Sequence, residues 1–465
     1  RPHARARAGA GAHRGTPRAM SAHGRRAPRV ASPALNPGVA GREVAAWAMY
    51  DFANSGYTTV VLTAVFNAYF VSVIAANAPW ATFAWTAALA VSYALVIIAG
   101  PVLGAWADAH AAKKQLLAWS TLVCIAGTVA LAWCGPGTVA WAATFIVVSN
   151  FAYSMGENLC AAFLPELARP EALGKVSGWG WSLGYFGGIL ALGLCLAWVM
   201  TAQSRGSTTS EAVGGTMFIT AAVYALAALP TFLFLRERAR PTRAHRANEA
   251  FARLLQTARE SRRYRDLLLV FACGMFYQAG VATVIALAAI YAEQVMGFKT
   301  QDTILLILVV NVTGAFGAFG FGYAQDRMGK VAALRFTIAL WVVMTVVAYF
   351  STTAAMFWVA ANLAGLCMGS SQSAGRALVA YLSPADRSAE FFGLWGVAIR
   401  IAAILGPITY GGVTWITHGD HRLAILLTGA YFVVSLAILA FVDEGRGRKQ
   451  VAGNDPRPFD ADERR

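Results

Sequence analysis

The sequence predicts an all-α membrane protein with about twelve transmembrane helices, arranged as two pseudo-symmetric six-helix bundles. Three observations predict this class: the composition, the recurrence of long apolar runs and an internal repeat. The chain has 465 residues, of which 57% are hydrophobic and only 13% are charged. With a mean hydropathy of +0.53, this much apolar surface cannot be hidden from water in a soluble domain.

Apolar runs of roughly 20 residues, the length that crosses a hydrocarbon core, recur along nearly the whole chain. The predicted spans of the first half are 47–75, 83–108, 116–133, 139–164, 176–200 and 216–235. Those of the second half are 267–292, 304–325, 332–350, 354–382, 391–416 and 423–442. The predicted domains are a basic disordered tail (1–41), an N-terminal bundle (42–235), a basic linker (236–265), a C-terminal bundle (266–442) and a tail (443–465).

The formal net charge of +15 does not indicate a nucleic-acid partner, because the basic residues fall on alternate sides of the predicted spans. The positive-inside rule therefore predicts that both termini and the linker are cytoplasmic. The segment before Met20 has no apolar core, so it is no secretory signal; we expect a disordered tail or a start at Met20, and less readily a transit peptide. The six cysteines show no metal-ligand or disulfide spacing, and we expect no metal or cofactor.

One motif occurs near the end of the second span and again near the end of the eighth. GPVLGAWADAHAAKK and GAFGFGYAQDRMGK share a glycine, an aspartate four residues later and a following lysine, at an offset of about 218 residues. NSGYTTV in the first span and QAGVATV in the seventh repeat at about 224 residues. The repeated loop residues, for which we predict a gating role, are Gly104, Asp108 and Lys113 in the first half and Gly322, Asp326, Arg327 and Lys330 in the second.

Six plus six spans with this loop motif resemble the major facilitator superfamily, whose signature reads G-x-x-x-D-R-x-G-R/K-K. The second copy fits closely, whereas the first has Ala-His-Ala-Ala where arginine and glycine are expected. The resemblance implies alternating access between two bundles, with these loops sealing the cytoplasmic side through closure contacts between helices.

Several longer motifs are similar to the vacuole-effluxer-like family, which includes fungal autophagy-related vacuolar amino-acid exporters and bacterial members. They include WAMYDFANSGY, FLPELARPEALGKVSGWGWSLGYFGG and EFFGLWGVAIRIAAILGP. This resemblance implies a secondary transporter of efflux type. We further expect a monomer in the lipid bilayer of a bacterial inner membrane that moves a small polar solute. The chain departs from the family at Ala161, where an asparagine is expected, and at Ala279, where relatives tend to have aspartate.

Polar residues inside the spans follow helical spacing. A charge at the centre of a span costs at least about 2.5 to 3.5 kcal/mol, so each one needs a partner, a water-filled cavity or a task. Residues three, four and seven apart share a helix face. The candidate substrate or coupling residues are Asp51, Asn54, Ser55 and Thr58 in the first span, Asn150, Tyr153 and Glu157 in the fourth, Gln278 in the seventh, Gln372 and Arg376 in the tenth, and Arg400 in the eleventh.

Glu157 and Arg376 are about 219 residues apart, so they occupy nearly matching places in the two halves. An anion on one wall and a cation on the other suit a zwitterion such as an amino acid, with its carboxylate on Arg376 and its ammonium towards Asp51 or Glu157. A carboxylate that loses and regains a proton would couple transport to H⁺.

Simpler interpretations stand beside this hypothesis. In one, Glu157 and Arg376 form a salt bridge that only holds the two halves together. In another, Asp51 lies near the cytoplasmic surface, where it caps a helix or pairs with a loop arginine. For Arg400 the alternatives are that it binds an anionic group or that it snorkels to the cytoplasmic face. Trp47, Trp80 and Trp181 read as interfacial anchors or packing residues rather than a ligand box.

Competing functions are a solute sensor or membrane scaffold that kept the fold, and a transporter of sugars, organic acids or drugs. An enzyme is disfavoured, because the sequence shows no catalytic triad pattern and no phosphate-binding loop.

Overall fold

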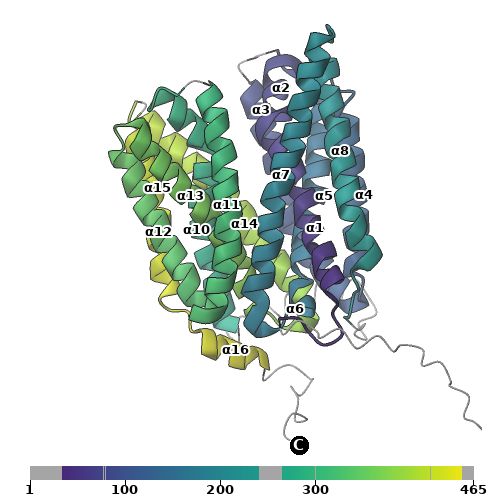
Figure 1. Cartoon of the computed structure of the whole chain (residues 1–465), viewed down its shortest axis with the longest axis vertical. Coiled ribbons are helices and arrows are strands. Elements are labelled where there is room, and N and C mark those ends of the chain that lie inside the picture. Colours follow the sequence, from purple (N-terminus) through teal and green to yellow (C-terminus); the bar gives the residue numbers. More distant parts are fainter. Residues whose placement is uncertain are drawn as a thin grey trace, which may run out of the picture.

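The computed structural model describes residues 34–452, apart from residues 77, 79, 240–263, 299 and 419. Within this part, 12 helices are long and apolar enough to cross a membrane. They form two bundles that lie side by side, with the first half of the chain in purple and teal and the second half in green and yellow (Figure 1). The predicted all-α fold class with two helical bundles is confirmed.

The long helices of the first half are α1 (Gly41–Tyr57), α3 (Ala81–His110), α4 (Lys113–Leu131), α5 (Val139–Ala161), α7 (Leu173–Ser204) and α8 (Thr209–Phe234). Those of the second half are α10 (Arg265–Gln294), α11 (Thr300–Met328), α12 (Lys330–Phe350), α13 (Ala354–Leu382), α14 (Ser388–Ile416) and α15 (His421–Leu439). Two short helices, α6 (Leu164–Leu167) and α16 (Glu444–Ala452), are on the side of the molecule where the described part of the chain begins and ends (Figure 1). This side of the molecule is called the terminal side below.

The first span is not the continuous α-helix that the apolar run predicts. After α1 the chain winds as a π-helix over Thr58–Ala64, and α2 (Phe66–Tyr69) leads into a second π-helical turn, Phe70–Ile74. The Thr63 hydroxyl donates to the Thr58 carbonyl five residues earlier, at 2.9 Å. Hydroxyl side chains that bond to nearby carbonyls compete with the regular helical ladder, and apolar periodicity does not reveal this local change of winding.

Residues 34–40, at the end of the predicted tail, pack against the segment that follows α6. The Asn36 amide N–H donates to the Leu167 carbonyl at 3.1 Å, and the Arg169 amide N–H donates to the Ala34 carbonyl at 3.1 Å. Arg238, at the start of the predicted linker, donates to the Glu43 carboxylate at 2.8 Å. The described parts of the tail and the linker are thus fastened to the first half.

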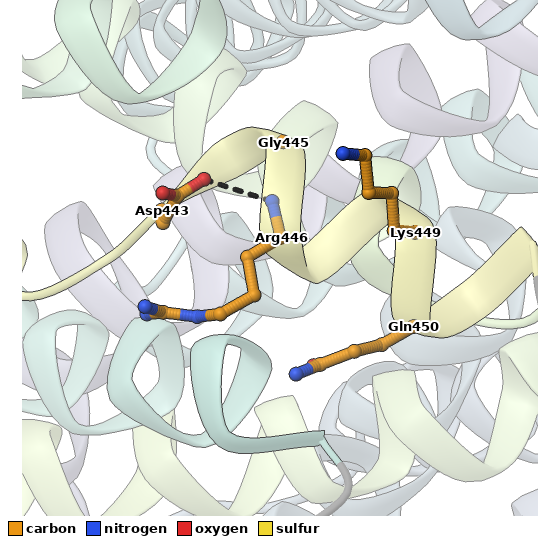
Figure 2. Close-up of a pocket in the computed structure, with 5 residues that line it drawn as sticks. All are labelled: Asp443, Gly445, Arg446, Lys449 and Gln450. Carbon is orange, nitrogen blue, oxygen red and sulfur yellow. Dashed lines mark hydrogen bonds between the residues drawn. The ribbon is translucent and has the colours of Figure 1, made fainter.

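Several contacts join helix α16 to the second half, among them Arg448 with the Tyr381 carbonyl and Glu444 with the Val331 N–H, and the ion pair of Arg446 is the one that involves a fully buried side chain. Arg446 donates two hydrogen bonds to the Asp266 carboxylate at the start of α10, at 2.6 and 2.8 Å, and the Asp266 side chain is fully buried. The Arg446 amide N–H also donates to Asp443 (Figure 2). Arg446 and Lys449, which lies one turn further along and is exposed, both line a surface pocket (Figure 2).

Arg446→Ala is expected to lower the unfolding midpoint in detergent, because it leaves the buried Asp266 carboxylate without its charged partner. Lys449→Ala removes a positive charge from the same helix without removing that partner, so it is expected to leave the midpoint unchanged. Thermal unfolding of both variants checks this, and equal midpoints for the two would contradict it.

Candidate functional site

Asp51 on α1 and Arg376 on α13 form a buried ion pair between the two halves. Arg376 Nη1 donates to Asp51 Oδ2 at 2.7 Å, and the side chains of Asp51 and Arg376 are 12% and 7% exposed. Arg376 Nε donates to the Ser177 hydroxyl at 3.0 Å, and Nη2 donates to the Ser177 carbonyl at 2.8 Å. The guanidinium is thus contributed by the second half, whereas these acceptors belong to the first.

Two indole rings flank this guanidinium. The Arg376 guanidinium carbon lies 4.8 Å from the ring centroid of Trp47 and 5.3 Å from that of Trp181, within the range of cation–π attraction. Trp47 is fully buried and Trp181 half-buried, so neither is an interfacial anchor; both pack against the core, as the alternative interpretation has it, and both also lie over the guanidinium, whereas Trp80 is 50% exposed. Position along a helix does not show which side chain from another helix will lie over a ring.

A glycine makes room for the ion pair. A Cβ at Gly180 would contact Asp51 Oδ2 and would lie 2.7 Å from Arg376 Nη2 and 2.9 Å from the Trp47 ring. Any larger residue would push these groups apart. The Asp51 cluster, defined as Asp51, Ser177, Trp47, Trp181 and Gly180, therefore depends on a small residue on α7.

Glu157 on α5 and Arg400 on α14 form a second ion pair between the halves. Arg400 Nη2 donates to Glu157 Oε2 at 2.7 Å, and the guanidinium lies 5.3 Å from the ring centroid of Tyr93 on α3. Arg400 is buried, so the snorkelling interpretation is wrong, but the Glu157 side chain is 31% exposed. Arg400 Nε has no hydrogen-bond partner among the described residues.

The predicted partnership of Glu157 with Arg376 is therefore wrong. The repeat offset places these two residues in matching positions of the two halves, and pseudo-symmetry maps matching positions onto each other without making them face each other. Arg376 instead points at α1 and α7. The interpretation in which Asp51 pairs with a loop arginine is wrong as well, because its partner lies within α13.

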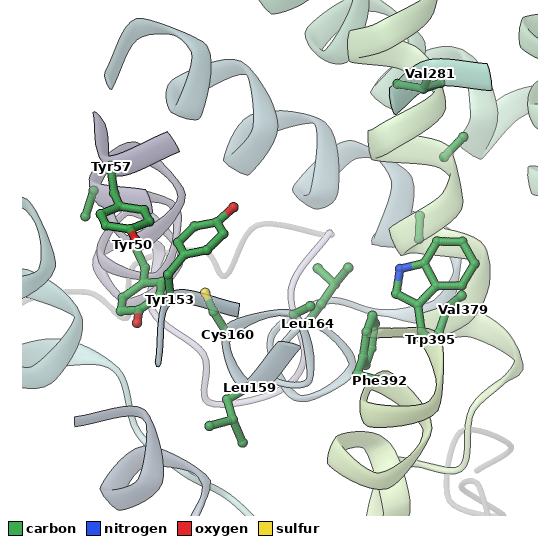
Figure 3. Packing of buried hydrophobic residues seen from close by; sticks show 14 of the residues in the cluster. Tyr50, Tyr57, Tyr153, Leu159, Cys160, Leu164, Val281, Val379, Phe392 and Trp395 are labelled. Carbon is green, nitrogen blue, oxygen red and sulfur yellow. The ribbon is translucent and has the colours of Figure 1, made fainter. Parts of the chain in front are cut away.

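Contacts between α1 and α5 set the relative depth of the two carboxylates. Trp47 Nε1 donates to the Cys160 carbonyl at 2.8 Å, and the rings of Tyr57 and Tyr153, about three turns away along α1 and about two along α5, stack at 5.1 Å. Figure 3 shows these two tyrosines side by side. The helices are antiparallel, and both carboxylates lie one turn from the Trp47 contact, towards the tyrosine stack. The two ion pairs therefore lie at nearly the same depth.

Other predicted residues do not bridge the halves. Asn54 accepts a hydrogen bond from Tyr224 on α8 at 2.6 Å, and Asn150 donates to Ser92 on α3 at 2.9 Å, so both lie inside the first half. The hydroxyl of Thr58 donates to the carbonyl of Ser55. The polar residues that follow Asp51 on this face of the first span therefore contact the first half rather than the second.

Gln278 and Gln372 join two helices of the second half. Each side-chain amide donates to the other side chain's carbonyl oxygen, at 2.7 and 3.2 Å. This reciprocal pair links α10 to α13 one turn from Arg376. Ser177 and Tyr93 were not predicted as partners of the arginines; the run SGWGW, with small residues beside two tryptophans, is the one local signal that points to Ser177.

The two repeated loop aspartates cap helices of the opposite half. Asp326 accepts hydrogen bonds from the backbone N–H groups of Gly174 at 3.0 Å and Lys175 at 2.7 Å, at the start of α7. Asp108 accepts one from the backbone N–H of Glu390 at 2.9 Å, at the start of α14. A carboxylate at a helix N-terminus is stabilised by the free N–H groups and the helix dipole. Each half thus closes on the other by the same device.

The two loop lysines lie beside these aspartates. Lys113 is fully buried; its ammonium is 3.7 Å from Asp108, contacts Glu166 and donates to Ser388 of the other half at 3.2 Å. Lys330 lies 3.6 Å from Asp326. Arg327, which completes the motif in the second copy, is exposed.

Glycines allow close approach at the same side. A Cβ at Gly104 would contact the Ala389 backbone, and one at Gly322 would lie 3.0 Å from the Gly174 carbonyl. The contacts of α7 with α11 continue to Tyr185, and beyond this the ribbons of the two halves diverge (Figure 1). The structure is therefore closed on the terminal side.

A resident metal has no support in this arrangement. Among the residues that the structure describes, no group of three or more histidines, cysteines or acidic residues could hold a metal ion. The six cysteines are free and buried. The chemistry that the site offers is the pairing of opposite charges across the interface between the two halves.

Comparison with known proteins places this geometry in a family. The model of the family described as "Vacuole effluxer Atg22 like" matches residues 81–452. An MFS-type transporter of Bacillus subtilis, YxiO, described as uncharacterized, is 29% identical over 404 residues, covering 86% of this chain and 94% of its own. Autophagy-related protein 22-1 of Neosartorya fischeri is 23% identical over 303 residues, which are 59% of this chain and 49% of that protein.

Solved structures share the fold. The crystal structure of the human organic anion transporter MFSD10 superimposes with a TM-score of 0.67 at 14% identity, covering 86% of this chain and 99% of that one. The Bacillus subtilis relative is described as a transporter and the matching family as an effluxer, so the prediction of a transporter rather than an enzyme is confirmed. Because the family model matches most of the chain, this protein belongs to the vacuole effluxer Atg22-like family of MFS-type transporters.

Proposed function

We propose that this family member exports an amino acid or a related zwitterion by alternating access, with protons as the coupling ion. The observation that carries the proposal is the sign of the charges. In both ion pairs within the membrane the carboxylate belongs to the first half and the arginine to the second, at nearly the same depth. A solute with an ammonium and a carboxylate can bind to both walls at once.

Alternating access requires both ion pairs to break. When the terminal side opens, Asp51 and Glu157 move away from Arg376 and Arg400, and each charge must find another partner in a medium of low dielectric constant. The ammonium of the solute binds the carboxylates and its carboxylate binds an arginine. A carboxylate without a cation takes up a proton instead, which couples the proton gradient to the return of the empty protein.

The direction of transport rests on orientation and on relatives. The positive-inside rule supports a cytoplasmic location of the terminal side. The membrane in this proposal is a bacterial inner membrane, and the transporting unit is a monomer. The family description as an effluxer supports export. In this orientation the structure is closed towards the cytoplasm, through the caps at Asp108 and Asp326.

Purified protein in proteoliposomes tests the proposal. A loaded amino acid is expected to exchange across the bilayer, with a pH change in the vesicle lumen that disappears in the Asp51→Asn/Glu157→Gln variant. Glu171→Gln, an exposed carboxylate on the terminal side, is the matched control and is expected to retain the pH change. A solute that raises the unfolding midpoint but never crosses the bilayer would favour the sensor instead.

A second outcome bears on the substrate class. Sugars, organic acids and drugs are screened in the same vesicles, and transport of an uncharged sugar with both ion-pair carboxylates neutralised would contradict the zwitterion proposal.

A further inference from the structure

We infer that the Asp51 cluster is a binding site for a planar cation, which Arg376 occupies while the terminal side is closed and which the guanidinium of a solute occupies when it opens. The inference rests on the proposed function and narrows the solute to amino acids or amines that end in a guanidinium group. Arg376 then acts as a built-in competitor of the solute.

Every group that recognises the Arg376 guanidinium belongs to the first half. The Asp51 carboxylate accepts from Nη1 at 2.7 Å, the Ser177 carbonyl accepts from Nη2 at 2.8 Å and the Ser177 hydroxyl accepts from Nε at 3.0 Å. Three acceptors thus meet three different nitrogens of one planar fork. Withdrawal of α13 removes the cation and leaves this set of acceptors within the first half.

The shape of the cluster favours a flat cation over an ammonium. The indoles of Trp47 and Trp181 lie 4.8 and 5.3 Å from the guanidinium carbon, and Gly180 provides the room beside it. A guanidinium stacks on aromatic rings and directs its N–H groups outward in one plane. An ammonium is a compact, strongly hydrated point charge that does not match a planar set of acceptors between rings.

An empty Asp51 cluster would be costly. Removing one partner of a buried ion pair leaves a charge that the interior does not solvate, so a replacement cation or a proton has to enter. The Asp51 side chain is less exposed to solvent than that of Glu157, which favours a cation that fits the cluster over one that keeps its hydration shell.

The second ion pair repeats the pattern and supplies a place for a second positive charge. Glu157 binds the Arg400 guanidinium at 2.7 Å, with the Tyr93 ring 5.3 Å away, and Glu157 is the more exposed carboxylate. Since both carboxylates lie at the same depth on neighbouring helices, one solute with a guanidinium and an α-ammonium can contact both. L-Arginine has these groups, together with a carboxylate that the freed arginines can bind.

The test removes the competitor. Arg376→Gln protein in detergent is expected to bind L-arginine and agmatine at least ~10-fold more tightly than the wild type, measured by calorimetry, because the Asp51 cluster is vacant. L-Citrulline, which has nearly the same shape but an uncharged ureido group in place of the guanidinium, is expected to show no gain. The Arg376→Gln/Asp51→Asn double variant is expected to lose the gain for both cations.

A milder variant guards against misfolding. Arg376→Lys keeps the positive charge but presents an ammonium to the planar site, so it is expected to compete less and to give a gain of a few-fold for L-arginine. Unchanged or weaker L-arginine binding in both Arg376 variants would overturn the inference, as would an equal gain for L-citrulline.

Transport separates this inference from the proposed function. If the wild type exchanges a neutral amino acid in proteoliposomes while Arg376→Gln gains no affinity for L-arginine, the planar-cation site is wrong and the transport proposal stands. If Arg376→Gln gains affinity while no solute crosses the bilayer in any variant, the site is supported and the transport proposal fails.

Discussion

Asp51→Asn is expected to abolish transport and to lower the stability of the protein by about 3 to 5 kcal/mol, the usual cost of removing one partner of a buried ion pair. The variant leaves the Arg376 guanidinium 7% exposed between two indoles with no carboxylate beside it. It also removes the acceptor that we propose for the cationic group of the solute. Arg376→Gln, which leaves the carboxylate unpaired, is expected to be destabilised to a similar degree.

The double variant Asp51→Asn/Arg376→Gln separates stability from transport. Neutralising both partners removes the unpaired charge, so most of the lost stability is expected to return, whereas transport is not. Unfolding midpoints and flux, measured on the two single variants and the double variant, form a double-mutant cycle. Strictly additive losses of stability would show that the two charges do not interact as the structure indicates.

Gly178→Ala is expected to prevent closure of the terminal side and to shift the protein by ~100-fold or more towards the opposite conformation, which corresponds to about 2.8 kcal/mol. A Cβ at this position on α7 would lie 2.5 Å from the Ala318 carbonyl and 2.9 Å from Gly322 Cα, both on α11. Because these are backbone atoms, no change of side-chain rotamer relieves the clash, and the two helices must separate. Transport is then expected to stop for lack of one of its two states.

A reporter cysteine measures this shift. Ser388→Cys places a thiol at a position that is buried against the other half in the closed state, where the serine donates to the Ala162 carbonyl at 2.9 Å. The native cysteines are all buried, so they are expected to react slowly with a labelling reagent. For Cys134, which lies outside the spans, burial also raises the pKa of the thiol and so lowers the fraction of reactive thiolate. Faster labelling of the reporter is expected with Gly178→Ala than without it.

Gly193→Ala provides the control on the same helix. A Cβ at Gly193 meets nothing within 4 Å, so this change tests the effect of alanine on α7 without touching the interface. It is expected to leave both labelling and transport at the wild-type level. If the two variants label equally fast, closure does not depend on the approach of α7 to α11.

Most properties that depend on local sequence could be predicted, the π-helical winding of the first span being an exception. A run of apolar residues has to be a buried helix in a bilayer, because no other conformation satisfies its backbone groups without water. The number of spans and the repeated Gly-x-x-x-Asp motif follow from residues close together in the chain. The placement of Asp51, Glu157, Arg376 and Arg400 within spans follows in the same way, because an intramembrane charge is conspicuous in sequence.

The pairing of those charges could not be predicted, because it depends on how one bundle packs against the other. Helical periodicity tells which residues share a face of one helix, but it contains no information about the rotation of a helix against a partner more than 200 residues away in the chain. The repeat suggested a pair of Glu157 with Arg376. This pairing was wrong because residues at matching positions of a duplication are equivalent and need not be in contact. The sequence by itself determined twelve spans, two halves and four charges within the spans. Only the tertiary structure decided that Arg376 pairs with Asp51 beside Trp47 and Trp181, because this contact exists only where helices of both halves meet.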